Sequence, residues 1–298
     1  MRERGYHPRP MLAQHDIRAV LAFLAPWEFS PAALALCAGA VLLYARGLRR
    51  MPAKERPNIG RRLAFFAGWA LVYFVMQTRW DYWSQHMFFI HRIQHLVLHH
   101  LGPFLVALAR PLPALARGLP DGIDARVLRP LGHSRPLRLA YRALQNAIVA
   151  PVLFVGLIFF WLTPPIHFDA MLNARLYLVM NWSMLLDGLL FWALMLDPRT
   201  RSQGALIGFG PRIFLLLGAV LPQIYIGARI GLATHELFNV YSVCGRAWPI
   251  SPLEDQSLGG LVTWIPAGMM HTLGVLVLLA RWMRADNEAH VRAAAVRG

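Results

Sequence analysis

Charged residues and cysteines are both scarce in this chain. Of its 298 residues, 15% are charged and 57% are hydrophobic, whereas a soluble domain carries about a quarter charged residues. The two cysteines, Cys37 and Cys244, do not form a Cys-x-x-Cys pair. The low charge excludes an ordinary soluble globular protein. The isolated cysteines argue against thiol redox chemistry, a zinc site and an intramolecular disulfide.

The chain contains several long apolar stretches. About 20 apolar residues can cross a bilayer, and seven stretches of that order occur, at 29–46, 62–79, 88–109, 145–163, 175–196, 213–232 and 258–280. The sequence therefore predicts an all-α polytopic membrane protein with seven transmembrane helices. We expect residues 1–28 to be a basic tail containing a short interfacial helix at 15–27. We expect residues 29–280 to form the transmembrane domain and residues 281–298 to form a cytoplasmic tail.

The basic residues are unevenly distributed along the chain. Lysine and arginine number 30 against 15 acidic residues, and most of them fall in the segments 46–62, 110–142, 199–212 and 281–297. If the chain crosses the membrane seven times, all four segments lie on the same side of it. The positive-inside rule then places the N-terminus outside and the C-terminus in the cytoplasm. We interpret the excess charge as topology and contact with lipid headgroups, not as nucleic-acid binding.

Histidines inside the third expected helix are the most informative feature. His91, His95 and His99 recur every fourth residue, which on a helix makes a stripe about 80° wide. Met87 extends the stripe towards the outer surface, and Gly102-Pro103 predicts a kink below it. Ionisable groups in a membrane span are costly and suggest function, and imidazole is the commonest metal ligand. The alternative is that these histidines only hydrogen-bond neighbouring helices.

The fifth and seventh expected helices place further candidate ligands at a similar depth. His271 lies about as deep as His99, so one site can combine His271 with His95 or His99. Met184 can add a thioether sulfur. Mixed imidazole and thioether ligands favour copper(I) over magnesium, calcium or manganese.

Several polar residues are candidates for orienting such ligands. Asp187 lies near the midplane of the fifth helix, where a lone carboxylate costs about 3 kcal/mol, so it needs a partner. The sequence leaves open whether a histidine, oriented by the carboxylate for metal binding, or Arg92 or Arg229 is that partner. The other candidates are Gln94, Asn181, Asp255 and Gln256. Asp255 can equally cap the seventh helix.

Three motifs in this order resemble one known family. They are His91-Arg-Ile-Gln94-His95 with Gly102-Pro103 and Arg110-Pro111, then Gly188-Leu-Leu-Phe-Trp192, and Asp255-Gln-x-x-Gly-Gly260-x-x-x-Trp264-Ile-Pro266. Together they resemble the CtaG family of cytochrome c oxidase assembly factors, over most of the chain from Trp27 to His271.

The resemblance implies a seven-span protein of the bacterial plasma membrane that helps to mature a haem–copper oxidase, by handling copper. His91 and His95 occupy the paired histidine positions of the family. Implied partners are the copper-carrying oxidase subunits, membrane lipids and periplasmic copper carriers. The chain departs from the pattern at Met180-Asn181, where many relatives have Glu-His, and so loses one imidazole from the fifth helix.

Three functions are compatible with these residues. In the leading hypothesis, Met87, His91 and His95 capture copper(I), His99 and His271 share it, and ligand exchange replaces enzymatic chemistry. The second is a b-type cytochrome or quinone-linked redox protein, with haem between His95 and His271. The third is a metal-free assembly scaffold in which the histidines only join helices.

Overall fold

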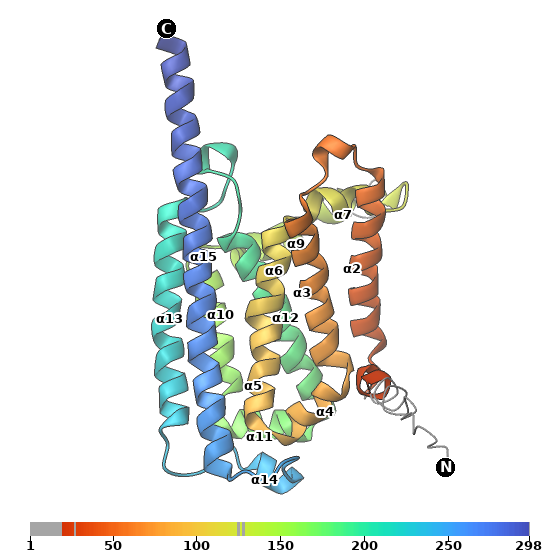
Figure 1. Cartoon of the computed structure of the whole chain (residues 1–298), viewed down its shortest axis with the longest axis vertical. Helices are drawn as coiled ribbons and strands as arrows, with labels where there is room; N and C mark the ends of the chain where they lie inside the picture. The colour runs from red at the N-terminus through yellow and green to blue at the C-terminus, as the bar shows by residue number, and fades with distance from the viewer. Residues whose placement is uncertain (1–19, 27, 124–125, 127–128, 298) are drawn as a thin grey trace, which may run out of the picture.

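The computed structural model describes residues 20–26, 28–123, 126 and 129–297, and its described part is helical without strands, as predicted (Figure 1). All seven expected segments contain helix. The long helices and the pieces of the third segment are α2 (Pro31–Arg50), α3 (Ile59–Gln77), α5 (Phe88–Leu96), η2 (Val97–Leu101), α6 (Gly102–Ala109), α10 (Val149–Trp161), α12 (Ala174–Met195), α13 (Phe209–Gly231) and α15 (Pro252–Arg297). The shorter ones are η1 (Ala53–Glu55), α4 (Arg79–His86), α7 (Leu112–Gly118), α8 (Arg129–His133), α9 (Arg135–Leu144), α11 (Pro164–Leu172), η4 (Arg201–Gln203) and α14 (Val240–Cys244).

Several of these helices can cross a membrane. Within the described residues, five are long and apolar enough by themselves: α2, α3, α12, α13 and α15. The pair α9 and α10 qualifies together, bent by 72°, and would make a sixth span. The chain is therefore a multi-pass helical membrane protein, while the count of seven spans and the orientation of the termini stay predictions. The interfacial helix expected at 15–27 lies mostly outside the described residues, of which 20–24 are helical.

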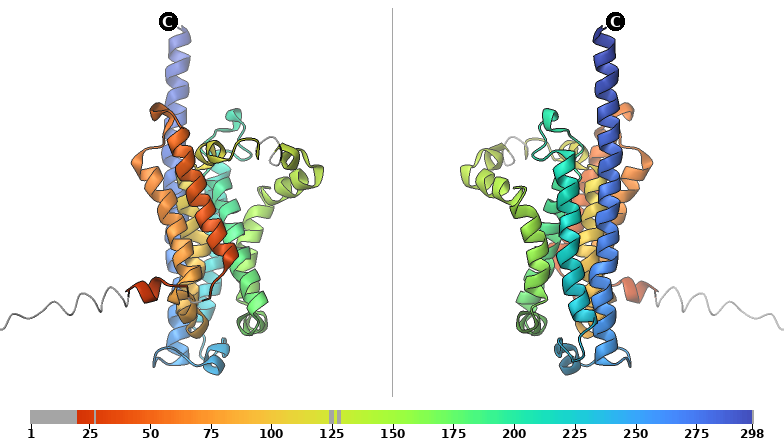
Figure 2. Two further views of the ribbon diagram at one scale, coloured as in Figure 1. Left: turned by 90° about the vertical axis from the view of Figure 1, so that its right-hand side faces the viewer. Right: turned by 90° about the vertical axis from the view of Figure 1, so that its left-hand side faces the viewer.

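The long helices form one bundle with distinct ends. Helices α4, α11 and α14 lie at one end, which we name the α11 end, and α7 lies at the other, the α7 end (Figure 1). The connection between α2 and α3, the one after α12 and the far part of α15 also lie at the α7 end. Figure 2 shows α10 leaning away from the bundle towards that end, where α9 continues it. The basic segments thus gather at one end, as the predicted topology requires.

The third segment forms the middle of the bundle and is irregular at its centre. Residues 88–109 stay helical, but α5 and α6 are joined by the π-helical turn η2. Pro103 lies two residues after this turn and cannot donate an N–H to the carbonyl one turn earlier, which favours such an irregularity. A π turn inserts an extra residue and is frequent at functional sites. As a result His99 and His100 both lie in the turn.

Helix α12 packs very closely against this turn at a glycine. A Cβ atom built on Gly188 would lie 2.5 Å from the carbonyl oxygen of His99, far inside van der Waals contact. Only glycine permits this approach. Gly188, the first residue of the Gly188-Leu-Leu-Phe-Trp192 motif, therefore sets the distance between α12 and the histidine helix.

Candidate metal centre

Two histidine rings from α5 lie against each other near the α11 end. The ring centroids of His91 and His95 are 4.3 Å apart, and both residues are buried. His95 Nε2 donates to Asn181 Oδ1 on α12 at 3.2 Å, which leaves Nδ1 unprotonated and without a partner. Neither nitrogen of His91 has a hydrogen bond of normal geometry, although the backbone of Ser84 lies nearby. Buried polar atoms rarely stay unpaired, so these nitrogens call for an explanation such as a bound ion.

A third imidazole, which the sequence analysis did not single out, packs against the ring of His91. His167 lies on α11, and its ring centroid is 5.2 Å from that of His91, at right angles to it. Its Nδ1 donates to the Trp161 carbonyl and its Nε2 accepts from the Tyr241 hydroxyl, both at 3.0 Å. Burial lowers the pKa of His167 to about 3, so the ring stays neutral. With both nitrogens in use, His167 positions its neighbours and is not a free ligand.

The π turn directs two consecutive histidines to different helices. His99 Nε2 donates to Asp187 Oδ2 on α12 at 3.0 Å, so the partner of Asp187 is a histidine. His100 Nε2 donates to Gln223 Oε1 on α13 at 3.1 Å. The amide of Gln223 is held in this orientation because its Nε2 donates to the Ala219 carbonyl. In both rings Nδ1 is left unprotonated, buried and without a partner.

His271 on α15 has the opposite tautomer and faces this turn. Its Nδ1 donates to the Ala267 carbonyl at 2.8 Å, so Nε2 is the unprotonated nitrogen and has no partner. The neighbouring ring is that of His100, with centroids 5.5 Å apart. The sequence had proposed His95 or His99 for this position. A four-residue spacing assumes a regular α-helix, and the extra residue of the π turn brings His100 round instead.

A water-sized cavity lies between α5, α10, α12 and α15. Its volume is about 10 Å³, close to the minimum that holds one water molecule or ion. The lining residues are Arg92, His95, Leu96, His100, Ile158, Met184, Val262, Thr263 and Ala267. The structure therefore brings together the predicted ligands His95 and Met184, and adds His100 to them.

The donor set and a nearby charge limit which ion can bind here. Among the described residues, no three His, Cys, Asp or Glu side chains converge closely enough to hold a metal ion, whereas structural zinc needs four ligands. Arg92 also lines the cavity, buried, with its Nε donating to Thr263 Oγ1 at 3.0 Å. Its charge repels a divalent cation twice as strongly as a monovalent one. Two imidazoles and a thioether beside Arg92 therefore suit copper(I) best.

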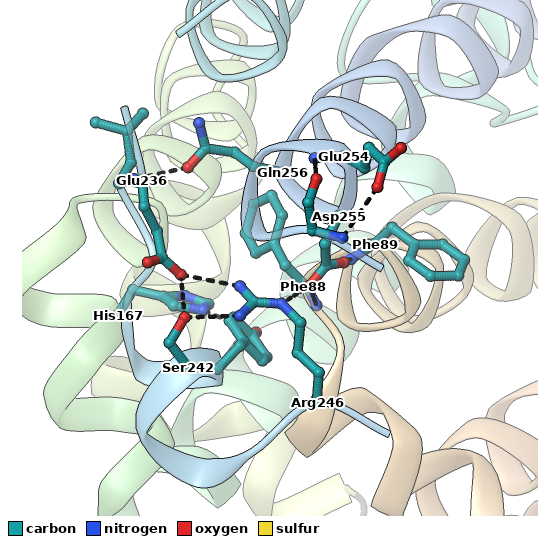
Figure 3. A network of polar contacts seen from close by, with 12 residues as sticks. Phe88, Phe89, His167, Glu236, Ser242, Arg246, Glu254, Asp255 and Gln256 are labelled. Atoms are coloured by element: carbon teal, nitrogen blue, oxygen red, sulfur yellow. Dashed lines mark hydrogen bonds and ion pairs between the residues drawn. The ribbon is translucent and has the colours of Figure 1, made fainter. Parts of the chain in front are cut away.

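Asp255 and Gln256 hold the helices at the α11 end and lie in a polar network apart from this cavity (Figure 3). Asp255 accepts from the backbone N–H groups of Phe88 and Phe89 at 3.0 and 2.9 Å, and so caps α5 from a distant helix. It also pairs with Arg246 at 3.2 Å. Its own helix is capped by Ser251, whose Oγ accepts from the Glu254 N–H.

Gln256 ties the loop after α13 to α15. Its Oε1 accepts from the Leu237 N–H at 2.7 Å, and its Nε2 donates to the His235 carbonyl at 3.1 Å. Met87, the residue before α5, is fully buried. Of the two polar residues, it is Asp255 that holds the start of the histidine helix.

Gln94 belongs to a buried network around a carboxyl group that the sequence did not single out. Asp81 Oδ1 accepts from Gln94 Nε2 at 2.8 Å and from the Tyr177 hydroxyl at 2.7 Å. Burial raises the pKa of Asp81 to about 6, against the lowering effect of these hydrogen bonds. The ring of Tyr177 lies 6.1 Å from that of His91. Asp81 and His167 lie on short helices between the apolar stretches, where burial is not evident from composition.

Comparison with known proteins confirms the resemblance seen in the motifs. The family described as "Cytochrome c oxidase caa3 assembly factor (Caa3_CtaG)" matches residues 42–285. An uncharacterized protein of Mycobacterium bovis is 28% identical over 90% of this chain and 41% of its own length. One from Mycobacterium leprae is 26% identical over 92% and 42%. The chain thus spans about two fifths of these curated relatives, and no solved structure matches it.

Proposed function

Because this chain belongs to the Caa3_CtaG family of cytochrome c oxidase caa3 assembly factors, we propose that it holds copper(I) inside the bacterial plasma membrane and delivers it to an oxidase subunit. The supporting observation is the water-sized cavity lined by His95, His100 and Met184. Each of the two imidazoles has one nitrogen fixed by a side-chain amide on a neighbouring helix and one lone pair left over. This is how proteins orient and tune histidine ligands for metals.

The remaining histidines suggest a route for the ion. Neither nitrogen of His91 has a hydrogen bond of normal geometry, and the centroid of its ring is 4.3 Å from that of His95, towards the α11 end. On the other side of the cavity, the ring centroid of His100 is 5.0 Å from that of His99 and 5.5 Å from that of His271. Copper(I) can move along such a row by exchanging one imidazole for the next, with no covalent chemistry. We propose entry from a periplasmic carrier at the α11 end, which the predicted topology places outside.

The alternative functions fit less of this geometry. A haem between His95 and His271 has no space in a cavity of about 10 Å³. A metal-free scaffold accounts for the bonds of His95, His99 and His100 to other helices. It leaves unexplained why five buried histidines each keep an unpaired nitrogen.

Copper binding tests the proposal directly. The detergent-purified protein is titrated with copper(I) against a competing chelator under anaerobic conditions, and we expect one tightly bound equivalent. His95→Gln and His100→Gln each remove an imidazole while keeping an N–H donor for the neighbouring helix, and should weaken binding at least tenfold. His290→Ala, on an exposed part of α15, serves as the matched control.

The same variants separate copper delivery from scaffolding in cells. In a strain that depends on this protein for its oxidase, His95→Gln should lower oxidase activity, and added copper should partly restore it. Tight copper binding that persists in both glutamine variants, or normal oxidase activity in both, would refute the proposal.

A further inference from the structure

A second cavity, at the α7 end, is surrounded by arginines. It has a volume of about 350 Å³ and lies where the start of α3, the end of α6 and the middle of α15 meet. Its lining residues are Asn58, Gly60, Arg61, Leu108, Arg110, Val277, Ala280, Arg281 and Arg284. Four of these nine are arginines and none is acidic. The volume lies in the range of small-molecule sites, about 300–1,000 Å³.

Among the residues that the structure describes, no ion pair neutralises the charges of these arginines. In the described part of the chain, no carboxylate forms an ion pair with any of the four. The Arg281 guanidinium donates to the Leu196 carbonyl, and Arg110 Nε is buried without a partner. An arginine N–H that is buried and unpaired costs free energy, which an anion would recover.

Asp197 is an acidic residue whose charge acts on Arg110 and Arg281, but it is engaged by another arginine. Asp197 is held by Arg199, with Nε–Oδ1 at 3.0 Å and Nη2–Oδ2 at 2.7 Å. Burial lowers the pKa of Arg110, the charge of Arg61 lowers it further, and Asp197 only partly opposes this. The arginines around the cavity therefore repel one another, and an anion between them would relieve that repulsion.

The backbone adds to the positive potential of this cavity. Helix α3 begins here, with Asn58 Oδ1 accepting from the Arg61 N–H at 3.0 Å and no acidic residue in its first turn. The start of a helix carries about half a positive charge and favours anions. Arg110, directly after α6, has a positive φ of 52°, a backbone conformation that is strained for a residue other than glycine. Such strain is characteristic of functional positions.

We infer that this cavity binds the phosphate group of an anionic phospholipid. Phosphate suits several guanidinium groups around a helix start, and Leu108, Val277 and Ala280 line the same space with apolar atoms. A free phosphate ion would use the arginines but not these apolar residues. Basic cavities between membrane helices are known to take lipid headgroups. The lipid would join α3, α6 and α15, and so brace the inner end of the histidine helix.

Lipid-dependent stabilisation tests this inference without reference to copper. The purified full chain is placed in nanodiscs of phosphatidylcholine with increasing phosphatidylglycerol, and its melting temperature is followed. We expect saturable stabilisation by several degrees. Arg110→Gln with Arg281→Gln should raise the half-saturating lipid fraction at least tenfold. The matched control is Arg46→Gln with Arg49→Gln, which removes the same charge from exposed positions at the end of α2.

Two further arms make the result decisive. Arg284→Gln, at an exposed position, should shift half-saturation in the same direction even if the double variant unfolds. Inorganic phosphate is added to nanodiscs of phosphatidylcholine alone and should give no comparable shift. Equal losses in the test and control pairs would overturn the site, and full stabilisation by inorganic phosphate would overturn its assignment to lipid.

Discussion

The contact between Gly188 and the π turn provides a sharp test of how the site is built. A methyl group at residue 188 would lie 2.5 Å from the carbonyl oxygen of His99 and 3.0 Å from its carbonyl carbon. These are backbone atoms that cannot rotate away, so Gly188→Ala must move α12 outward. Reaching 3.0–3.4 Å, the tight limit of real Cβ contacts, requires a shift of about 0.5–0.9 Å.

Such a shift acts on both α12 residues that orient histidines. The His99–Asp187 and His95–Asn181 bonds, now 3.0 and 3.2 Å, would be stretched towards or beyond hydrogen-bonding distance. Overpacking of this kind costs about 1–3 kcal/mol.

We therefore expect the Gly188→Ala protein to melt at a lower temperature and to bind copper(I) more weakly in the chelator titration. The control is Gly218→Ala on α13, where an added Cβ meets nothing within 4 Å and alanine favours the helix by up to about 1 kcal/mol. If both variants show unchanged stability and copper affinity, α12 is not held at this distance by the glycine, and the argument fails.

Two other residues lead to independent predictions. Because the pKa of Asp81 is about 6 in the folded protein, against 3.8 for an unperturbed aspartate, the folded state holds its proton more tightly. Stability should therefore fall by up to about 3 kcal/mol as pH rises from 4 to 7. Unfolding measured across this range should show a smaller fall in Asp81→Asn, and an unchanged slope would contradict the assignment. Asp255→Ala removes the cap of α5 and a partner of Arg246, and should cost about 1–2 kcal/mol. Glu254→Ala, which alters the exposed cap of α15 instead, is the comparison, and equal losses would count against a special role of Asp255.

The sequence predicted the helices well because lipid exposure demands long apolar runs. Each of the seven stretches became helical, and the need of Asp187 for a partner was met by His99. Both predictions depend on one physical rule, the cost of polar groups in hydrocarbon, which acts on every residue in a span.

Predictions from helical spacing were less successful, because they assume regular geometry. The π turn at residues 97–101 brought His100 beside His271, although Gly102-Pro103 had signalled an irregularity there. Asp255 caps α5 across the bundle, and the arginine cavity joins residues more than 200 positions apart in the chain. Such contacts depend on how the helices pack, which no local pattern specifies.

The most direct test of the copper site is its donor set. X-ray absorption at the copper edge of the protein loaded with one equivalent of copper(I) should show two nitrogen donors and one sulfur donor. Met184→Leu should remove the sulfur and keep the nitrogens, whereas Met283→Leu, at an exposed position, should change nothing. A copper ion bound with only oxygen donors, or with sulfur that persists in Met184→Leu, would contradict the site described above.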